Sequence, residues 1–186
     1  MLGYISASGR GAADRLLADL ARDLGAQGVA LSGVVQLNRE TRPDRHCDMD
    51  LQVLGHDHIV RISQDLGPNA RGCRLDAQGL VAAVALVEAD LARAPELVII
   101  NKFGKSEIEG RGFREIFGQA IAAGIPVLTA VNSGNLAGFL SFAGDLAEEV
   151  VAEPAALRQW TAVKLSSARE FRALTPDRIA CQSEQG

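Results

Sequence analysis

Short unbroken apolar runs alternate along the chain with stretches in which apolar residues recur every three or four positions. The runs are short and continuous, as in strands buried on both faces of a parallel sheet, and they are residues 2–6, 29–37, 97–100 and 125–131. The stretches with helical spacing are residues 14–24, 80–91, 113–121 and 136–142. Asp76 is the predicted N-cap of the second helix. The alternation predicts an α/β fold with a mostly parallel sheet between two layers of helices.

The segment before Asp76 departs from this alternation. Residues 49–54 and 59–62 are β-type runs on either side of a polar turn, which predicts a β-hairpin inserted at about residues 46–63. After Pro154 the pattern is first helical and then polar. We therefore expect one three-layer α/β domain over residues 1–153, followed by a C-terminal helical extension and polar tail over residues 154–186.

Composition narrows the classes of function. The chain has 186 residues and a net charge of −4, which argues against a nucleic-acid surface because such a surface needs a basic face. No apolar run is long enough to span a bilayer, and no signal-type segment opens the chain, so a cytoplasmic protein without a membrane partner is expected. The apolar hairpin and the region around Trp160 could cover the core or a second subunit, so a homodimer remains open.

The first candidate site is the glycine-containing loop that follows the first strand. Its residues are Ser8, Gly9, Arg10 and Gly11. Glycines let backbone N–H groups approach an anion, and the N-terminus of the next helix adds positive potential. A working P-loop continues with Lys and Ser or Thr, but Ala12 and Ala13 stand there. The alternative interpretation is a tight strand-to-helix turn without a ligand.

The second candidate site follows the apolar run at residues 97–100. Its residues are Asn101, Lys102, Gly104, Lys105, Glu107 and Arg111. Ligands of parallel sheets bind beyond the carboxyl ends of the strands, a rule that points to residues 7–13, 101–107 and 131–134. The two lysines and the arginine would attract phosphate or another oxyanion. The alternative interpretation is a solvated loop with ordinary surface lysines.

The third candidate site is a metal centre built on Cys47 and Cys73. Cysteine, histidine and aspartate are all metal ligands, and His46, Asp48 and Asp50 lie beside Cys47. The chain contains neither CxxC nor HExxH, so the spacing is not diagnostic. The alternative interpretation is a small buried cysteine on a hairpin whose polar residues face solvent.

Several longer stretches resemble a bacterial family of unknown function whose members are often encoded near molybdate-transport genes. The stretches lie within residues 47–131 and read CDMDLQVL, RISQDLG, GCRLD, LVIINKFGKSEIEGRG and GIPVLTAV. The combination of NKFGKSEIEGRG with GCRLD carries most of the resemblance. It implies a link to molybdenum, which the residues by themselves do not indicate.

The layout is also similar to that of small nucleoside triphosphatases of the P-loop class. Gly104, Lys105 and Glu107 match the segment that follows the acidic Walker B motif of those enzymes. Asn101 and Lys102 replace the two acids of that motif, and alanines replace the Lys and Thr of the first loop. These departures argue against nucleotide hydrolysis. A hypothesis follows from the charges, namely that Lys102 supplies the missing positive charge and makes Mg²⁺ unnecessary.

Three functions remain open at this point. The first is a P-loop-like protein that binds a nucleotide or an oxyanion through degenerate Walker motifs, as a non-hydrolysing accessory or regulatory protein. The second is a molybdate- or metal-handling protein that uses Lys102, Lys105, Cys47 and Cys73. The third is an enzyme with one of the two lysines as base or electrostatic stabiliser. The expected partner is a small anionic ligand, either a nucleotide or molybdate.

Overall fold

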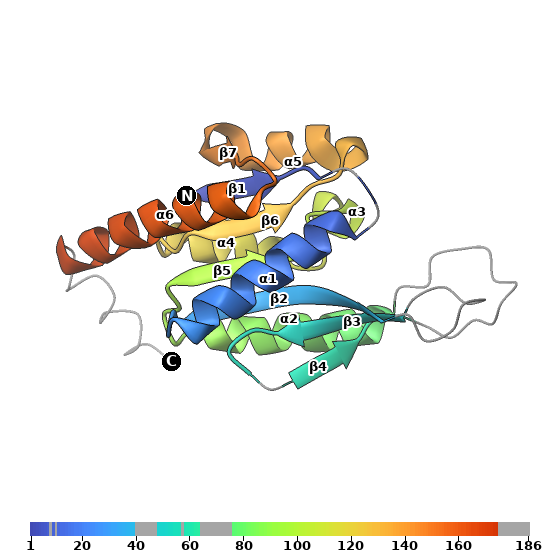
Figure 1. Cartoon of the computed structure of the whole chain (residues 1–186). Coiled ribbons are helices and arrows are strands. Elements are labelled where there is room, and N and C mark those ends of the chain that lie inside the picture. The colour runs from blue at the N-terminus through green and yellow to red at the C-terminus, as the bar shows by residue number, and fades with distance from the viewer. Residues whose placement is uncertain (8, 10, 40–47, 57, 64–75, 175–186) are drawn as a thin grey trace, which may run out of the picture.

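A computed structural model describes residues 1–7, 9, 11–39, 48–56, 58–63 and 76–174 of the chain. Its strands form one sheet in the order β4-β3-β2-β5-β6-β1-β7 (Figure 1). The strands are β1 Leu2–Ile5, β2 Leu31–Arg39, β3 Asp48–Val53, β4 His58–Arg61, β5 Leu97–Ile100, β6 Val127–Ala130 and β7 Ala147–Glu149. The α-helices are α1 Ala12–Ala26, α2 Ala77–Leu91, α3 Lys105–Ile108, α4 Arg114–Ala122, α5 Leu136–Ala143 and α6 Pro154–Leu174.

The sheet is mixed but mostly parallel. Strands β2, β5, β6, β1 and β7 are parallel to one another, while β3 pairs antiparallel with both β2 and β4. The predicted α/β class and the predicted hairpin are therefore confirmed. Asp76 caps α2 as expected, because its carboxylate accepts a hydrogen bond of 3.1 Å from the Gln78 N–H. Strand β7 and the single turn of α3 were not predicted from the sequence.

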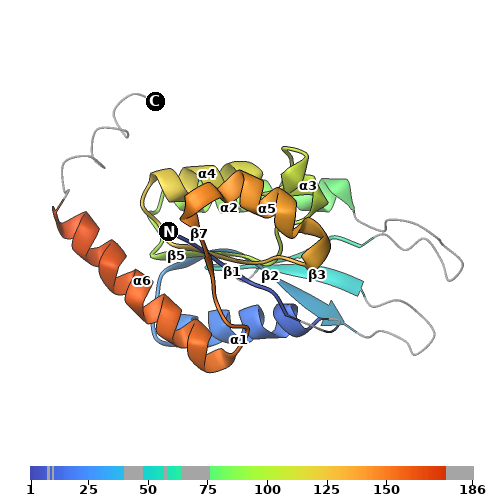
Figure 2. The same cartoon turned by 90° about the horizontal axis from the view of Figure 1, so that it is seen from above.

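Helices cover both faces of the sheet (Figure 2). Helices α1 and α6 lie on one face, and α2, α4 and α5 lie on the other. The first face buries Leu17, Leu20 and Leu24 of α1 together with Leu157 and Trp160 of α6. These buried residues follow the apolar stripe that the helical spacing predicts.

The second face contains the phenylalanine cluster of the core. The Phe103 ring, just beyond β5, lies 5.3 Å from Phe117 and 5.1 Å from both Phe139 and Phe142, measured between ring centroids. The Arg114 guanidinium lies 4.4 Å from the centroid of Phe142. Because Phe103 is buried among helices α4 and α5, it fixes the backbone that leads out of β5 towards the predicted second site.

Helix α6 is attached to the amino ends of the central strands. The Arg169 guanidinium lies 2.7 Å from the Glu96 carboxylate, just before β5, and this contact lowers the pKa of Glu96. At the other end of the same contact surface, a Cβ on Gly3 would lie only 2.5 Å from the Trp160 ring. The absence of a side chain at Gly3 thus lets α6 lie directly on β1.

Strand β2 contains a glycine that no other residue could replace without strain. Gly33 has a φ of 108°, in the left-handed region, and a Cβ there would lie 2.1 Å from the Ile99 carbonyl oxygen of β5. Its own carbonyl accepts a hydrogen bond of 2.9 Å from the Leu54 N–H at the end of β3. Gly33 therefore sets the point at which β2 leaves the parallel strands for the hairpin.

We expect Gly33→Ala to lower the free energy of unfolding by about 3 kcal/mol or more, since it combines backbone strain with a clash against β5. Gly25→Ala is the matched control, because a Cβ there meets nothing within 4 Å and the residue lies in α1. The control should gain up to about 1 kcal/mol. Urea unfolding of both variants measures the difference, and equal stabilities would contradict this account of β2.

Candidate functional site

The connections of the sheet define one place where loops diverge. Helix α1 carries the chain from β1 across one face to β2, whereas α5 carries it from β6 across the other face to β7 on the opposite side (Figures 1 and 2). Strands β1 and β6 are neighbours in the sheet. Loops that leave adjacent strands in opposite directions form a crevice at the carboxyl ends, where ligands of such sheets bind.

The glycine-containing loop leaves β1 at this point of the sheet. Gly9 and Gly11 have φ values of 95° and 71°, which only glycine adopts readily. Gly11 occupies the N-cap position of α1. Because glycine has no side chain, the N-cap residue makes no side-chain hydrogen bond to the first N–H groups of the helix. Helix α1 therefore begins with Ala12 and Ala13, at the positions where a P-loop has Lys and Thr. Ser8 and Arg10 lie outside the described residues, so their predicted role stays a prediction.

A buried polar network joins α1 to the carboxyl ends of β5 and β2. The Asp14 carboxylate, 3% exposed, accepts a hydrogen bond of 2.9 Å from the Asn101 side-chain amide. The Asn101 side-chain oxygen in turn accepts one of 2.8 Å from the Gln36 backbone N–H. Because Asp14 is separated from Asn101 by 87 positions, the network joins α1 to β5 and β2 through contacts that are remote in sequence.

Lys102 belongs to the same network. Its Nζ lies 3.1 Å from Oδ1 of Asp14, and Nζ also contacts the Gln36 side-chain oxygen at 3.4 Å. The ion pair with Asp14 neutralises the positive charge that Lys102 would otherwise give to the loop after β5. Asp14 and Gln36 were not among the predicted site residues. An acid in the first turn of a helix that follows a glycine loop is the one signal that could have indicated Asp14.

Glu107 has a structural task in the loop after β5. Its carboxylate is buried and accepts hydrogen bonds of 2.9 Å from the Gly104 N–H and 3.1 Å from the Phe113 N–H. Its backbone oxygen accepts a third bond, of 3.0 Å, from the Arg114 guanidinium. A Cβ at Gly112 would lie 2.2 Å from the same carboxylate, so a glycine is required there. Glu107 thus holds the ends of the loop together.

Lys105 and Arg111 lie on the outer side of this loop. Both cations pair with Glu109, Lys105 at 3.6 Å and Arg111 by a shorter contact. Their side chains are largely exposed, at 84% and 72%. An anion that binds either side chain would compete with the carboxylate of Glu109. Their predicted role in ligand binding stays a prediction.

The loop after β6 lies beside the loop after β5. The Asn132 side-chain oxygen accepts a hydrogen bond of 2.9 Å from the Asn135 N–H, which orders the turn η1 Ser133–Asn135. The Asn135 side-chain nitrogen would lie 3.8 Å from a Cβ on Gly104, so this loop packs beside the loop after β5. The three segments that the strand-end rule indicates therefore lie along one edge of the sheet.

The predicted metal centre falls on Cys47 and Cys73, and both cysteines lie outside the described residues. Within the part of the chain that the structure does describe, no three His, Cys, Asp or Glu side chains are grouped as metal ligands would be. Asp50 pairs with Arg61 at 3.1 Å. His56 bonds Asp90 at 2.7 Å, which attaches the hairpin turn to the end of α2.

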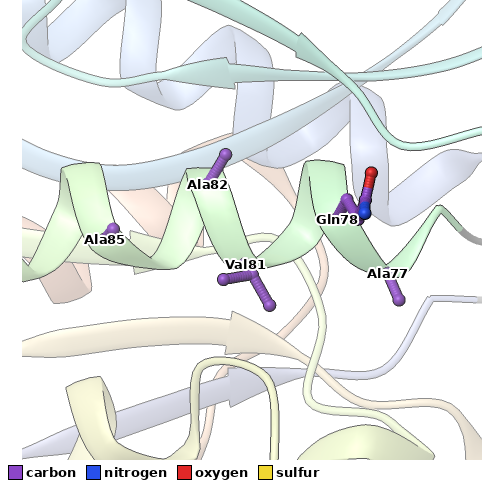
Figure 3. A pocket seen from close by; sticks show the side chains of 5 residues that line it. All are labelled: Ala77, Gln78, Val81, Ala82 and Ala85. Carbon is purple, nitrogen blue, oxygen red and sulfur yellow. The ribbon is translucent and has the colours of Figure 1, made fainter.

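A shallow hollow on the outer side of α2 has a different character. It is lined by Ala77, Gln78, Val81, Ala82 and Ala85 (Figure 3). None of these side chains carries a charge, so the hollow cannot supply the electrostatics that an anionic ligand needs.

None of the helices in the described ranges is both long and apolar enough to cross a membrane.

We expect Glu107→Gln to lower the free energy of unfolding by about 1–3 kcal/mol, because an amide offers one acceptor where two buried N–H groups need one each. Glu109→Gln is the matched control, two positions away and with its carboxylate on the outer side of the loop. Its effect should stay within about 0.5 kcal/mol. Chemical denaturation compares the two variants, and a Glu107→Gln protein as stable as the control would refute the structural role.

The chain is similar to part of a much longer protein. The chain is 38% identical, over 149 residues that make up 79% of its length, to the molybdenum import ATP-binding protein ModC 2 of Bradyrhizobium diazoefficiens. The match covers only 16% of that protein, so this chain is similar to one segment of it. No solved structure matches the chain.

A family model covers most of the described fold. The model, described as Protein of unknown function (DUF2478), matches residues 2–160 and so extends from β1 into α6. It spans the glycine loop, the hairpin, the loop after β5 and the loop after β6. The chain therefore belongs to the DUF2478 family of proteins of unknown function.

Proposed function

We propose that this chain binds a small anionic ligand, a nucleotide or a molybdate-like oxyanion, and acts as a non-hydrolysing accessory protein of molybdate import. The observation behind this proposal is the start of α1 after the glycine-containing loop that follows β1, where Gly11 is the N-cap and no side chain makes a capping hydrogen bond. Backbone N–H groups at such a helix start favour anions. The arrangement is that of a P-loop-like fold with degenerate Walker motifs.

The side chains at the phosphate and metal positions are poorly suited to hydrolysis. Phosphoryl transfer depends on cations that neutralise the charge developing on the transferred group. Ala12 and Ala13 offer neither an ammonium nor a hydroxyl at the start of α1. Asn101 stands where an acid would hold Mg²⁺, and its amide is engaged by Asp14 and Gln36. These groups can bind an anion but are poorly suited to cleaving one.

The link to molybdate import rests on the relative. A segment similar to this chain forms 16% of a protein named for molybdenum import and ATP binding. Domains joined in one polypeptide commonly act on the same process, so a role beside an importer is the natural extension.

The two alternatives, a lysine-based enzyme and a metal-handling protein, depend on other side chains. A lysine-based enzyme would need a substrate at Lys102 Nζ, and that atom contacts Asp14 and Gln36. A cysteine-based metal centre would rest on Cys47 and Cys73, which lie outside the described residues. The anion-binding function is favoured because the start of α1 and the loops after β5 and β6 belong to the described residues.

A thermal-shift series with MgATP, MgADP, molybdate, tungstate and phosphate tests this proposal. A ligand at about 100 times its Kd should stabilise the protein by about 2.7 kcal/mol, which raises the Tm by about 5–10 °C. Stabilisation by nucleotide alone would support a nucleotide-responsive regulator. Stabilisation by molybdate and tungstate but not phosphate would support an oxyanion protein. No shift with any of the five would refute anion binding.

Two charge variants test whether the Asp14 network borders the ligand. Asp14→Asn should strengthen and Lys102→Met should weaken anion binding, each by about three- to tenfold, because each changes one charge in a partly screened site. Arg22→Met is the control, since Arg22 lies near the opposite end of α1 and is 70% exposed. Calorimetric titration measures the three affinities. Shifts of the same sign in both site variants would contradict the placement.

A further inference from the structure

We propose that the outer face of α2 binds the same face of a second copy of this chain, as an antiparallel helix pair about a two-fold axis. The outer α2 face consists of the exposed side chains that line the shallow hollow, and of Glu88 about one turn further on, namely Ala77, Gln78, Val81, Ala82, Ala85 and Glu88 (Figure 3). It lies on a helix surface and not at the strand ends of the proposed anion site, so the inference does not rest on that function.

The outer α2 face has few of the groups that usually keep a surface helix in water. Residues 77–87 include no charged side chain, and Val81 is 68% exposed. Helix α1, on the other face of the sheet, shows the usual pattern, because Arg15, Asp19 and Arg22 follow one another along its exposed side. A helix that is apolar on all sides is typical of a buried position in a larger structure. The composition of α2 therefore indicates a helix that is covered on its outer side as well.

The inner side of α2 is already packed against its own subunit. Ala83 and Val87 are fully buried, and a Cβ on Gly79 would lie 2.3 Å from the Arg61 backbone oxygen of β4. A rotation of the helix would bring a side chain into the place where only a glycine fits. The outer α2 face thus cannot turn towards the sheet, and it can be covered only from the solvent side.

The outer α2 face is complementary to itself when two copies run antiparallel. Its positions 78, 81, 85 and 88 are alternately three and four residues apart, the spacing with which paired helices contact each other. With the two-fold axis midway between positions 81 and 85, Val81 faces the small side chain of Ala85 of the partner subunit. Gln78 then faces Glu88 of the partner subunit, where its side-chain amide can donate to the carboxylate. Two-fold symmetry gives each of these contacts twice.

Charge favours the antiparallel arrangement over a parallel one. A parallel pair would place the two Glu88 carboxylates beside each other, and like charges across an interface are unfavourable. The antiparallel pair separates them and also sets the two helix dipoles in opposite directions. Each helix has only 15 residues, so the contact is smaller than a standard protein interface. We therefore expect a reversible dimer with a dissociation constant of about 1–100 μM.

Analytical ultracentrifugation of the full chain at about 1–300 μM tests the inference, because wild type should pass from monomer to dimer over this range. Val81→Glu should raise the dissociation constant at least about 30-fold, since it introduces two carboxylates into each interface. Val163→Glu is the matched control, because Val163 is a 54% exposed valine of α6 on the opposite face of the sheet (Figure 2). The control should change the dissociation constant by less than about twofold. No ligand is added, so the result is independent of the thermal-shift series.

A charge exchange tests the antiparallel register. Gln78→Glu alone should weaken the dimer by about three- to tenfold, because the new carboxylate faces Glu88 of the partner subunit. The double variant Gln78→Glu with Glu88→Lys places opposite charges across the interface and should recover at least the wild-type affinity. Positions 78 and 88 lie about 15 Å apart along one helix, so this recovery cannot arise within a single subunit.

A wild-type chain that stays monomeric at the highest concentration would overturn the inference. A dimer that Val81→Glu leaves intact, or that Val163→Glu disrupts to the same extent, would do so as well. A double variant that dimerises as weakly as Gln78→Glu would overturn the antiparallel register. If Val81→Glu does not fold, as judged by circular dichroism, Ala85→Glu introduces the same charge at the facing position. Failure of both variants to fold would show that the outer α2 face is needed within one subunit, which also overturns the inference.

Discussion

The buried carboxylate of Asp14 is the constraint on which the carboxyl edge of this sheet depends. A charge that is almost fully removed from water is tolerated only when hydrogen bonds and an opposite charge compensate it. Asn101 and Lys102 provide both, and they follow each other directly at the end of β5. The start of α1, the end of β5 and the side of β2 are thereby fixed relative to one another.

Close packing also holds the strands and helices together at two glycines of the sheet. Gly3 admits the Trp160 ring of α6 against β1, and Gly33 admits the carbonyl of Ile99 against β2. On the other face, Phe103 enters the aromatic cluster one residue after Lys102. Residues 101 and 102 therefore make polar contacts with α1 and β2, and residue 103 makes apolar contacts with α4 and α5. The loop after β5 has little freedom to move as a whole.

Membership of the family and similarity to part of a molybdenum import ATP-binding protein set the chemistry in context. P-loop enzymes bind phosphates with a loop lysine and a metal held by acids. In this chain alanines occupy the first positions of α1, and an amide and a lysine occupy the strand end. The positive charge lies on the sheet, already paired with a carboxylate. This distribution of charge is the basis of the anion-binding function proposed above.

The sequence by itself determined the strands, the main helices and the hairpin, because burial on one or both faces of an element imposes a local periodicity. It also indicated the three loops that share one edge, because parallel strands end together. Only the tertiary structure decided the partners of Lys102 and the internal role of Glu107. The contact of Lys102 with Asp14 spans 88 positions, and the Glu107 carboxylate is satisfied by backbone groups that no side-chain pattern reveals. Strand β7 escaped prediction for a related reason, since its three residues gain strand geometry only by pairing with β1.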